Sequence, residues 1–136
     1  MKSTLAPGIT HTFRYEVPVE RTVPHLLPES PEFVAMPEVL ATGYMVGIIE
    51  WACIQALAPH LDEGEISLGT HVNLSHVAPT APGSTVTIDV RVESVDGRAV
   101  TFAVDARDEY ATISTGRHGR GVVNRDRFVG RLAARA

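Results

Sequence analysis

The chain has 136 residues, which suits one domain with one core, so we expect a single domain over residues 1–136. Hydrophobic residues make up 44% and charged residues 21% of the sequence, which is typical of a soluble globular protein. The net charge of −4 gives no overall preference for nucleic acid, and the single cysteine, Cys53, excludes an intrachain disulfide and favours a cytoplasmic setting.

The first ten residues show no regular pattern, and we expect them to be loose. Residues 11–17 then alternate, which predicts a first strand. Five prolines interrupt residues 18–37 and exclude a regular helix or a central strand there. The same stretch carries large apolar side chains: Val23, Leu26, Leu27, Phe33, Val34 and Met36. It is either a connection packed on the core or a lid, residues 19–37, over an apolar pocket.

A helix is predicted from about Thr42, a candidate N-cap, to Ala58. The segment is apolar on nearly every side, so we expect it to be buried. Glu50 lies in its middle, and residues 22–90 contain no Lys or Arg. A buried carboxylate needs hydrogen bonds, an opposite charge or a proton, so Glu50 is the first candidate for chemistry, with a distant arginine or a second subunit as possible partners. The helix is too short, and too interrupted by Glu50, to predict a membrane span.

The pattern after the helix has a period of two. Residues 65–77, 85–93, 100–106 and roughly 110–123 read as four antiparallel strands, with Asp96-Gly97 as a hairpin turn and a short helical turn at residues 128–134. One apolar helix needs a sheet to cover it, so we expect an α+β fold in which a curved antiparallel sheet wraps around the helix, similar to the hotdog fold. The exposed sheet edge of such a unit favours a homodimer.

His76 falls on the strand face that should pack against the helix, together with Leu68, Val72 and Leu74. Glu50 and His76 are therefore either an acid–base pair or a buried structural hydrogen bond. Thr42 precedes Glu50 by eight residues, about 12 Å along a helix, so it can join them only through a curled loop or across a dimer. Gly69 either admits a ligand close to the backbone or marks a bulge.

Several common sites are not predicted. The sequence has no phosphate-binding glycine motif and no serine-hydrolase elbow. Its six histidines lack metal-site spacing, so we expect no metal. The last twenty residues hold six arginines, and Arg117 and Arg120, on the last strand, either hold phosphates or face solvent.

Residues 37–53 closely resemble the hotdog-fold thioesterases typified by fluoroacetyl-CoA thioesterase, as do Ser67-Leu-Gly-Thr70 with His76 and residues 27–33. The resemblance spans roughly residues 19–120. It implies hydrolysis of a small acyl-CoA thioester in a homodimer, with coenzyme A as part of the substrate and no separate cofactor. It also implies catalytic roles for Thr42, Glu50 and His76.

The same resemblance places Gly69 at the acyl site and Arg120 near the substrate. It makes Val23, Leu26 and Phe33 a hydrophobic lid, and Met36 stands where the fluoroacetyl-CoA enzyme has a phenylalanine gate. Two other functions remain open on the sequence: a hotdog-fold hydratase or dehydratase of acyl thioesters, and an acyl-CoA binding module without catalysis. Release of free thiol from acyl-CoA distinguishes hydrolysis from both.

Overall fold

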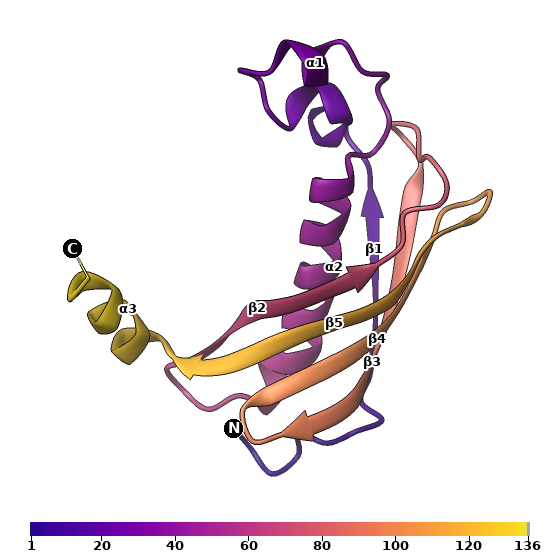
Figure 1. Ribbon diagram of the computed structural model, residues 1–136. Helices are drawn as coiled ribbons and strands as arrows, with labels where there is room; N and C mark the ends of the chain where they lie inside the picture. The colour runs from indigo at the N-terminus through magenta and orange to yellow at the C-terminus, as the bar shows by residue number, and fades with distance from the viewer. Residues whose placement is uncertain (136) are drawn as a thin grey trace.

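The computed structural model describes residues 1–135, and it consists of one antiparallel sheet curved around a central helix (Figure 1). The five strands follow the order β1-β3-β4-β5-β2 across the sheet. Their bounds are β1 Thr10–Glu16, β2 Glu65–Leu74, β3 Thr85–Asp96, β4 Ala99–Arg107 and β5 Thr112–Asn124. The predicted α+β arrangement is therefore present, with β1 and β2 as the two edge strands.

The two longer helices lie close to their predicted places, although the last one begins at Arg125 and not at Phe128. The central helix α2 spans Thr42–Leu57, and the last helix α3 spans Arg125–Ala133. The proline-rich segment forms short turns instead of one element: η1 Val19–Arg21, η2 Val23–His25 and α1 Pro31–Val34, with η3 Ala58–His60 after the central helix. The prolines explain this because each removes a backbone donor and fixes φ.

Strands β3 and β4 supply most of the sheet's share of the core. Their buried residues alternate along each strand, and Ile88, Val92 and Phe102 have no exposed surface. These side chains pack against the inner face of α2, where Ile49, Ala52 and Leu57 are equally buried. The Asp96-Gly97 turn joins the two strands as predicted, with Gly97 at a φ of 57° that favours glycine.

The expectation that α2 is buried on every side is wrong. Trp51 is 48% exposed and Ile54 is 43% exposed, and Gly43 and Gly47 lie on the same outer stripe. The reason is topological: one five-stranded sheet covers one side of a helix, and Phe13 of the edge strand β1 reaches only part of Trp51. The helix therefore keeps an apolar stripe that its own chain does not cover.

The predicted facing of β2 is partly wrong because the strand contains a bulge. Gly69 pairs with Arg120 and His71 pairs with Gly119, so Thr70 is an extra residue. Directly opposed residues share a face of the sheet. Val72 and Leu74 therefore face the helix side as predicted, but before the bulge this face is taken by Ser67 and Gly69, not by Leu68.

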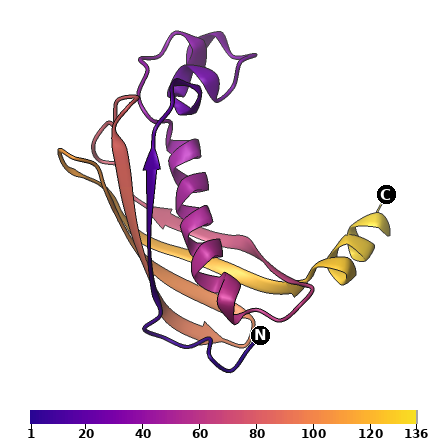
Figure 2. The same cartoon turned by 180° about the vertical axis from the view of Figure 1, so that it is seen from behind.

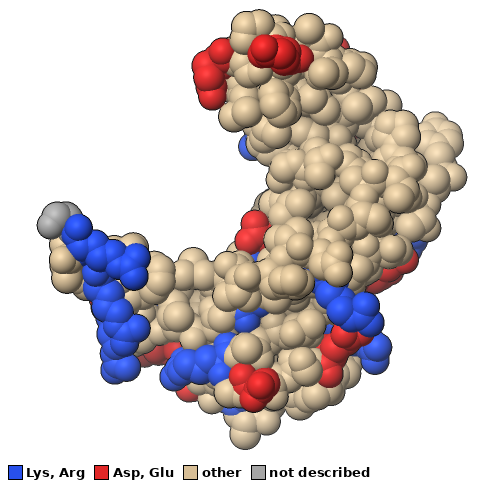
Figure 3. All heavy atoms as spheres, in the orientation of Figure 1, with Lys and Arg blue, Asp and Glu red and all other residues tan. Residues whose placement is uncertain are grey.

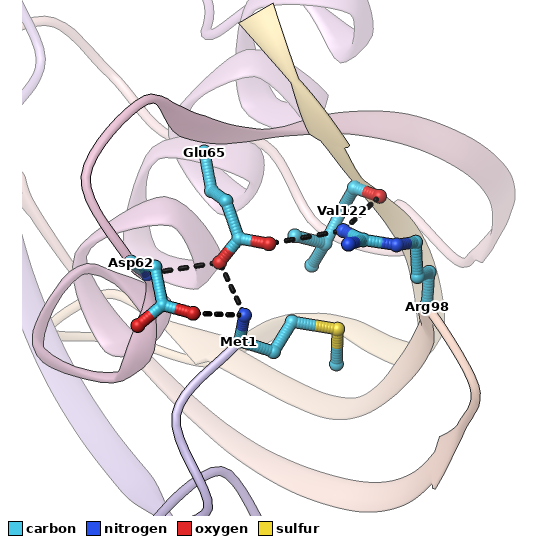
Figure 4. Close-up of polar contacts among 5 residues, drawn as sticks. All are labelled: Met1, Asp62, Glu65, Arg98 and Val122. Carbon is cyan, nitrogen blue, oxygen red and sulfur yellow. Dashed lines mark hydrogen bonds and ion pairs between the residues drawn. The ribbon is translucent and has the colours of Figure 1, made fainter.

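The first ten residues are not loose. Leu5 is buried in the core, and the backbone N–H of Lys2 donates to the carbonyl of His60 at 2.8 Å. The Met1 amine forms ion pairs with Asp62 and Glu65, and Arg98 donates to the second oxygen of Glu65 at 3.0 Å (Figure 4). These contacts lower the pKa of Glu65 to about 2, the hydrogen bond from the amine being the largest cause. Polar anchoring of this kind leaves no periodic pattern in a sequence.

The proline-rich segment, residues 19–37, which we call the lid segment, and α3 both stand away from the sheet, and the two views agree on this (Figures 1 and 2). A hollow lies between them in the space-filling view, with acidic side chains on the lid and basic ones on α3 (Figure 3). Within residues 1–135, no helix is both long enough and apolar enough to cross a membrane.

Candidate active site

Glu50 is paired with an arginine that is distant in sequence. Its Oε2 accepts a hydrogen bond from Nη1 of Arg120, on β5, at 2.9 Å. The Arg120 side chain is only 3% exposed, whereas the Glu50 side chain is 35% exposed. The carboxylate therefore stands at the edge of the helix with one side held by a buried cation and the other side open. The β5 pairing with β2 brings this arginine to the helix, which no local pattern near Glu50 indicates.

Arg120 is held in place by three further hydrogen bonds. Its Nε donates to Oγ of Ser67 and its Nη2 to the Ser67 carbonyl, both at 2.8 Å. His118 places its Nδ1 2.8 Å from the carbonyl of His71, which can only accept, so Nδ1 carries the proton. The free Nε2 of His118 then accepts from Nη1 of Arg120 at 3.1 Å. Burial, reinforced by the charge of Arg120, lowers the pKa of His118, which is consistent with a neutral ring.

Gly69 lies directly against the carboxylate of Glu50. A Cβ atom at this position would stand 2.8 Å from Oε2 of Glu50 and 3.7 Å from Nη1 of Arg120. A Cβ carbon essentially never comes this close to a non-bonded oxygen, so any side chain here displaces the carboxylate. The neighbouring Cys53 takes no part as a thiolate because burial raises its pKa to about 12.

We expect Gly69→Ala to reduce turnover at least tenfold while the protein stays folded. The obstructing atom belongs to the end of a flexible side chain, so Glu50 can rotate away from Arg120 and the backbone need not move. The comparison is kcat and urea unfolding for Gly69→Ala and for Gly47→Ala, where an added Cβ meets nothing within 4 Å. Unchanged turnover in Gly69→Ala would show that the position of the carboxylate does not matter.

Thr42 and His76 form a second polar pair at the start of α2. Oγ1 of Thr42 lies 2.8 Å from Nδ1 of His76, in a cleft of about 310 Å³ that Val23, Val39 and Val77 also line. The prediction that Thr42 is the N-cap is wrong. Ala41 is the N-cap, and Thr42 is the first helical residue. Its hydroxyl is therefore free of the helix end and available to the histidine.

His76 has one nitrogen satisfied and one not. Nε2 is buried and has no hydrogen-bond partner among residues 1–135. Burial lowers the pKa of His76, which favours the neutral ring. Buried polar atoms are nearly always hydrogen-bonded, so an orphaned nitrogen in a cleft indicates that another group binds there.

The predicted pairing of Glu50 with His76 does not form within the chain. Each has another partner, and His76 lies two residues beyond the end of β2, next to the helix start. Eight residues of α2, about 12 Å, separate the two halves along the helix. The structure thus brings Glu50 together with Gly69 and Arg120, and Thr42 together with His76, but does not unite the two groups.

The proline-rich segment is anchored at its base and exposed at its tip. Thr22 and Leu40 are buried and form a β-bridge, and Leu26 packs on Gly43 at the helix start. Of the residues assigned to the lid, Val23 lines the Thr42–His76 cleft and Phe33 is half-buried, while Met36, at the gate position, is 51% exposed. The segment therefore lies beside the cleft, with its base fixed to the core.

The strand arginines are engaged by protein groups. Arg117 makes two hydrogen bonds to Glu93, at 2.8 and 3.1 Å, on the outer surface. Arg120 directs four of its five N–H groups to Ser67, Glu50 and His118. Because Arg120 is only 3% exposed and most of its donors are engaged, the role that the geometry gives it is to hold Glu50.

Comparison with known proteins identifies the family. A family model described as fluoroacetyl-CoA-specific thioesterase matches residues 24–126. The chain belongs to this family. The fluoroacetyl-CoA thioesterase of Streptantibioticus cattleyicolor is 47% identical over 128 residues, which cover 94% of this chain and 92% of the relative. The prediction of a thioester hydrolase, made from residues 27–33, 37–53 and 67–70 with His76, is thereby confirmed.

Two solved structures are also similar. A Phe-to-Ala mutant of the fluoroacetyl-CoA-specific thioesterase, in complex with fluoroacetate and CoA, has a TM-score of 0.89 at 47% identity, covering 91% of this chain and 99% of that chain. A hot-dog-like protein from Thermanaerovibrio acidaminovorans has a TM-score of 0.81 at 26% identity, covering 95% of this chain and 91% of that one. The predicted hotdog fold is confirmed.

Sequence reasoning missed two members of the Glu50 network, Ser67 and His118. Both lie on strands at positions that read as ordinary alternation, and neither is adjacent to Glu50 in sequence. The pairing of β2 with β5 was needed to find them. A faint indication was available: His118 and Arg120 are two residues apart on one strand, so they share its face.

Proposed function

We propose that this protein hydrolyses small acyl-CoA thioesters to the free acid and CoA. The observation that carries the proposal is the pair of half-sites: a carboxylate fixed by a buried arginine, and a threonine–histidine pair with an orphaned ring nitrogen inside a lidded apolar cleft. Carboxylate and imidazole together supply the groups that thioester hydrolysis requires. The family membership and the complex of a relative with fluoroacetate and CoA support the substrate class.

In this proposal Glu50 drives attack on the thioester carbonyl, either directly or by activating a water molecule. His76 exchanges protons through Nε2, and Thr42 fixes the ring by its contact with Nδ1. The Val23 and Leu26 flank of the lid covers the acyl chain. The protein acts in the cytoplasm, without a metal or a separate cofactor.

We further propose a homodimer, because it unites the half-sites. The β2 edge is free, and its most exposed run is residues 69–73. Antiparallel pairing of two such edges about a two-fold axis at His71 or Val72 places His76 of the second copy opposite residues 66–68. Ser67, in that range, holds Arg120, which holds Glu50. Each dimer then contains two composite sites, each with Glu50 from one copy and Thr42–His76 from the other.

A thiol-release assay over a panel of acyl-CoAs tests the proposal. Acetyl-, fluoroacetyl-, branched and aromatic acyl-CoAs are compared, and we expect release of free CoA from the small acyl groups. Met36 replaces the phenylalanine at the gate, and methionine is flexible, so we expect a smaller preference for fluoroacetyl over acetyl than with an aromatic gate. Failure to release thiol from any of these substrates would refute the proposal.

The pH dependence of turnover follows from His76. Its pKa is lowered by burial, so the neutral ring survives below the ordinary imidazole value of about 6.5. We therefore expect kcat/KM to hold its plateau as pH falls through that value and to decline only at more acidic pH. Chromatographic measurement of released CoA checks this, with exposed His25→Asn as the control that leaves the profile unchanged. A decline centred at or above the ordinary value would contradict the assignment.

A further inference from the structure

Helix α3 is an arm with an uncovered apolar face. It continues from the end of β5 and projects away from the sheet, and none of its residues is buried (Figures 1 and 2). Phe128, Val129 and Leu132 fall on one side at helical spacing, and Val129 and Leu132 are 45% and 48% exposed. A nine-residue helix with so little support from its own chain gains stability from packing against another surface.

Two basic side chains of α3 also form no ion pair within the described chain. Arg127 and Arg131 are exposed and have no ion-pair partner among residues 1–135. The tip of the lid has the opposite character, because Glu29 and Glu32 are exposed there and likewise lack a basic partner in the described chain. Figure 3 shows acidic side chains on the lid and basic ones on α3, with the hollow between them.

The lid tip has a matching apolar surface. Leu27 is 41%, Val34 is 53% and Met36 is 51% exposed, a high degree of exposure for three large side chains of one short segment. The basic side chains of α3 therefore complement the acidic ones of the lid tip, and both surfaces also expose large apolar side chains. Exposed apolar patches with complementary charges are typical of protein–protein contacts, and here a second copy of this chain supplies the matching surface.

The register of the proposed dimer brings the two surfaces together. The backbone N–H of Arg125 donates to the carbonyl of Gly64 at 2.9 Å, so α3 starts beside Glu65 at the beginning of β2. With the two-fold axis at His71 or Val72, Glu65 lies opposite residues 77–79 of the second copy. That stretch lines the Thr42–His76 cleft together with Val23 and Val39, at the base of the lid.

We infer that α3 of each subunit packs against the lid of the other subunit and closes the Thr42–His76 cleft from outside. Val129 and Leu132 cover the exposed Val34 and Met36, while the α3 arginines meet the lid carboxylates. This inference rests on the proposed dimer and adds an element to its active site: the wall of each acyl pocket is completed by the C-terminal helix of the partner copy.

Disulfide trapping tests the contact. A chain with Leu132→Cys and Val34→Cys is oxidised and run on a non-reducing gel, and we expect most of it to migrate as a covalent dimer. Each single variant should give little, since its cysteine meets no second thiol. Native Cys53 gives a low background because it is fully buried and its pKa is about 12. The matched control joins Leu132→Cys with Asp96→Cys, in the exposed β3–β4 turn at the end of the sheet away from the lid, and should stay monomeric on the gel.

Charge reversal supplies the second readout. Arg127→Glu with Arg131→Glu should slow the cross-linking several-fold at low salt, and adding Glu29→Lys with Glu32→Lys should restore it. Absence of a covalent dimer, a disulfide within one chain, equal cross-linking of the control pair, or failure of the swap to restore the rate would each overturn the inference.

Light scattering and thiol release on the same samples separate this inference from the function. An active dimer without the cross-link rejects the α3–lid contact alone. A monomeric wild-type chain rejects the contact together with the dimer. A cross-linked dimer that releases no thiol from any acyl-CoA upholds the contact and refutes the proposed activity.

Discussion

Replacing Glu50 by glutamine should lower kcat for acyl-CoA hydrolysis by about 10³-fold or more while the fold remains intact. The amide keeps one oxygen that can accept the hydrogen bond from Arg120, which the carboxylate accepts at 2.9 Å. It loses the negative charge and the basicity that attack on a thioester needs. The helix around it is held by Ile49, Ala52 and Cys53, all of which are fully buried, so the backbone has no reason to move.

The measurement is kcat and KM from thiol release, with circular dichroism as the check on folding. Glu63→Gln is the matched control because Glu63 is an exposed acid in the turn before β2, and it should keep wild-type turnover. A fully active Glu50→Gln protein would remove this carboxylate from the mechanism.

Replacing Arg120 by methionine should cost stability as well as activity. The change leaves the Ser67 carbonyl, the Ser67 hydroxyl and Nε2 of His118 without their donor in a site where the arginine is 3% exposed. Removing one member of a buried charged network costs about 3 kcal/mol, and the partial exposure of Glu50 keeps the loss from being larger. Because the Glu50 carboxylate loses the arginine that holds it, kcat should fall as well.

Urea unfolding and thiol release measure the two effects. Arg117→Met is the control on the same strand: this exposed arginine pairs with Glu93 at the surface, and its loss should change the free energy of unfolding by less than about 1 kcal/mol. Combining Arg120→Met with Glu50→Gln should cost less than the sum of the single changes, because the two side chains interact directly. Equal stability of the Arg120 and Arg117 variants would contradict the network described above.

Periodic segments of the sequence were enough to predict the sheet, the central helix and the wrapped arrangement. Val86, Ile88, Val90 and Val92 alternate so regularly that β3 could be read directly, and it is buried as expected. The facing of β2 could not be read, since a one-residue bulge at Thr70 reverses the phase without changing composition. Anchoring of the N-terminal segment was missed for a related reason: it depends on polar contacts to Asp62 and Glu65, which have no period.

Glu50 was recognised from its apolar surroundings alone, but its partner was not. Arg120 is seventy positions away in sequence and reaches the helix only through the β2–β5 pairing. His76 was chosen as a site candidate by strand phase, and its side chain contacts Thr42, not Glu50. The family resemblance named all three catalytic candidates together; the geometry adds that they stand in two groups about 12 Å apart along α2.

Subunit complementation tests the composite site most directly. Glu50→Gln and His76→Ala chains, each inactive alone, are mixed in equal amounts under conditions that allow exchange, and thiol release is measured. If Glu50 of one copy acts with His76 of the other, half of the dimers are mixed and each has one intact site, so about a quarter of wild-type activity should return. If both residues of a working site belong to one chain, no mixture of these variants can regain activity, and a mixture as inactive as its components would contradict the shared site.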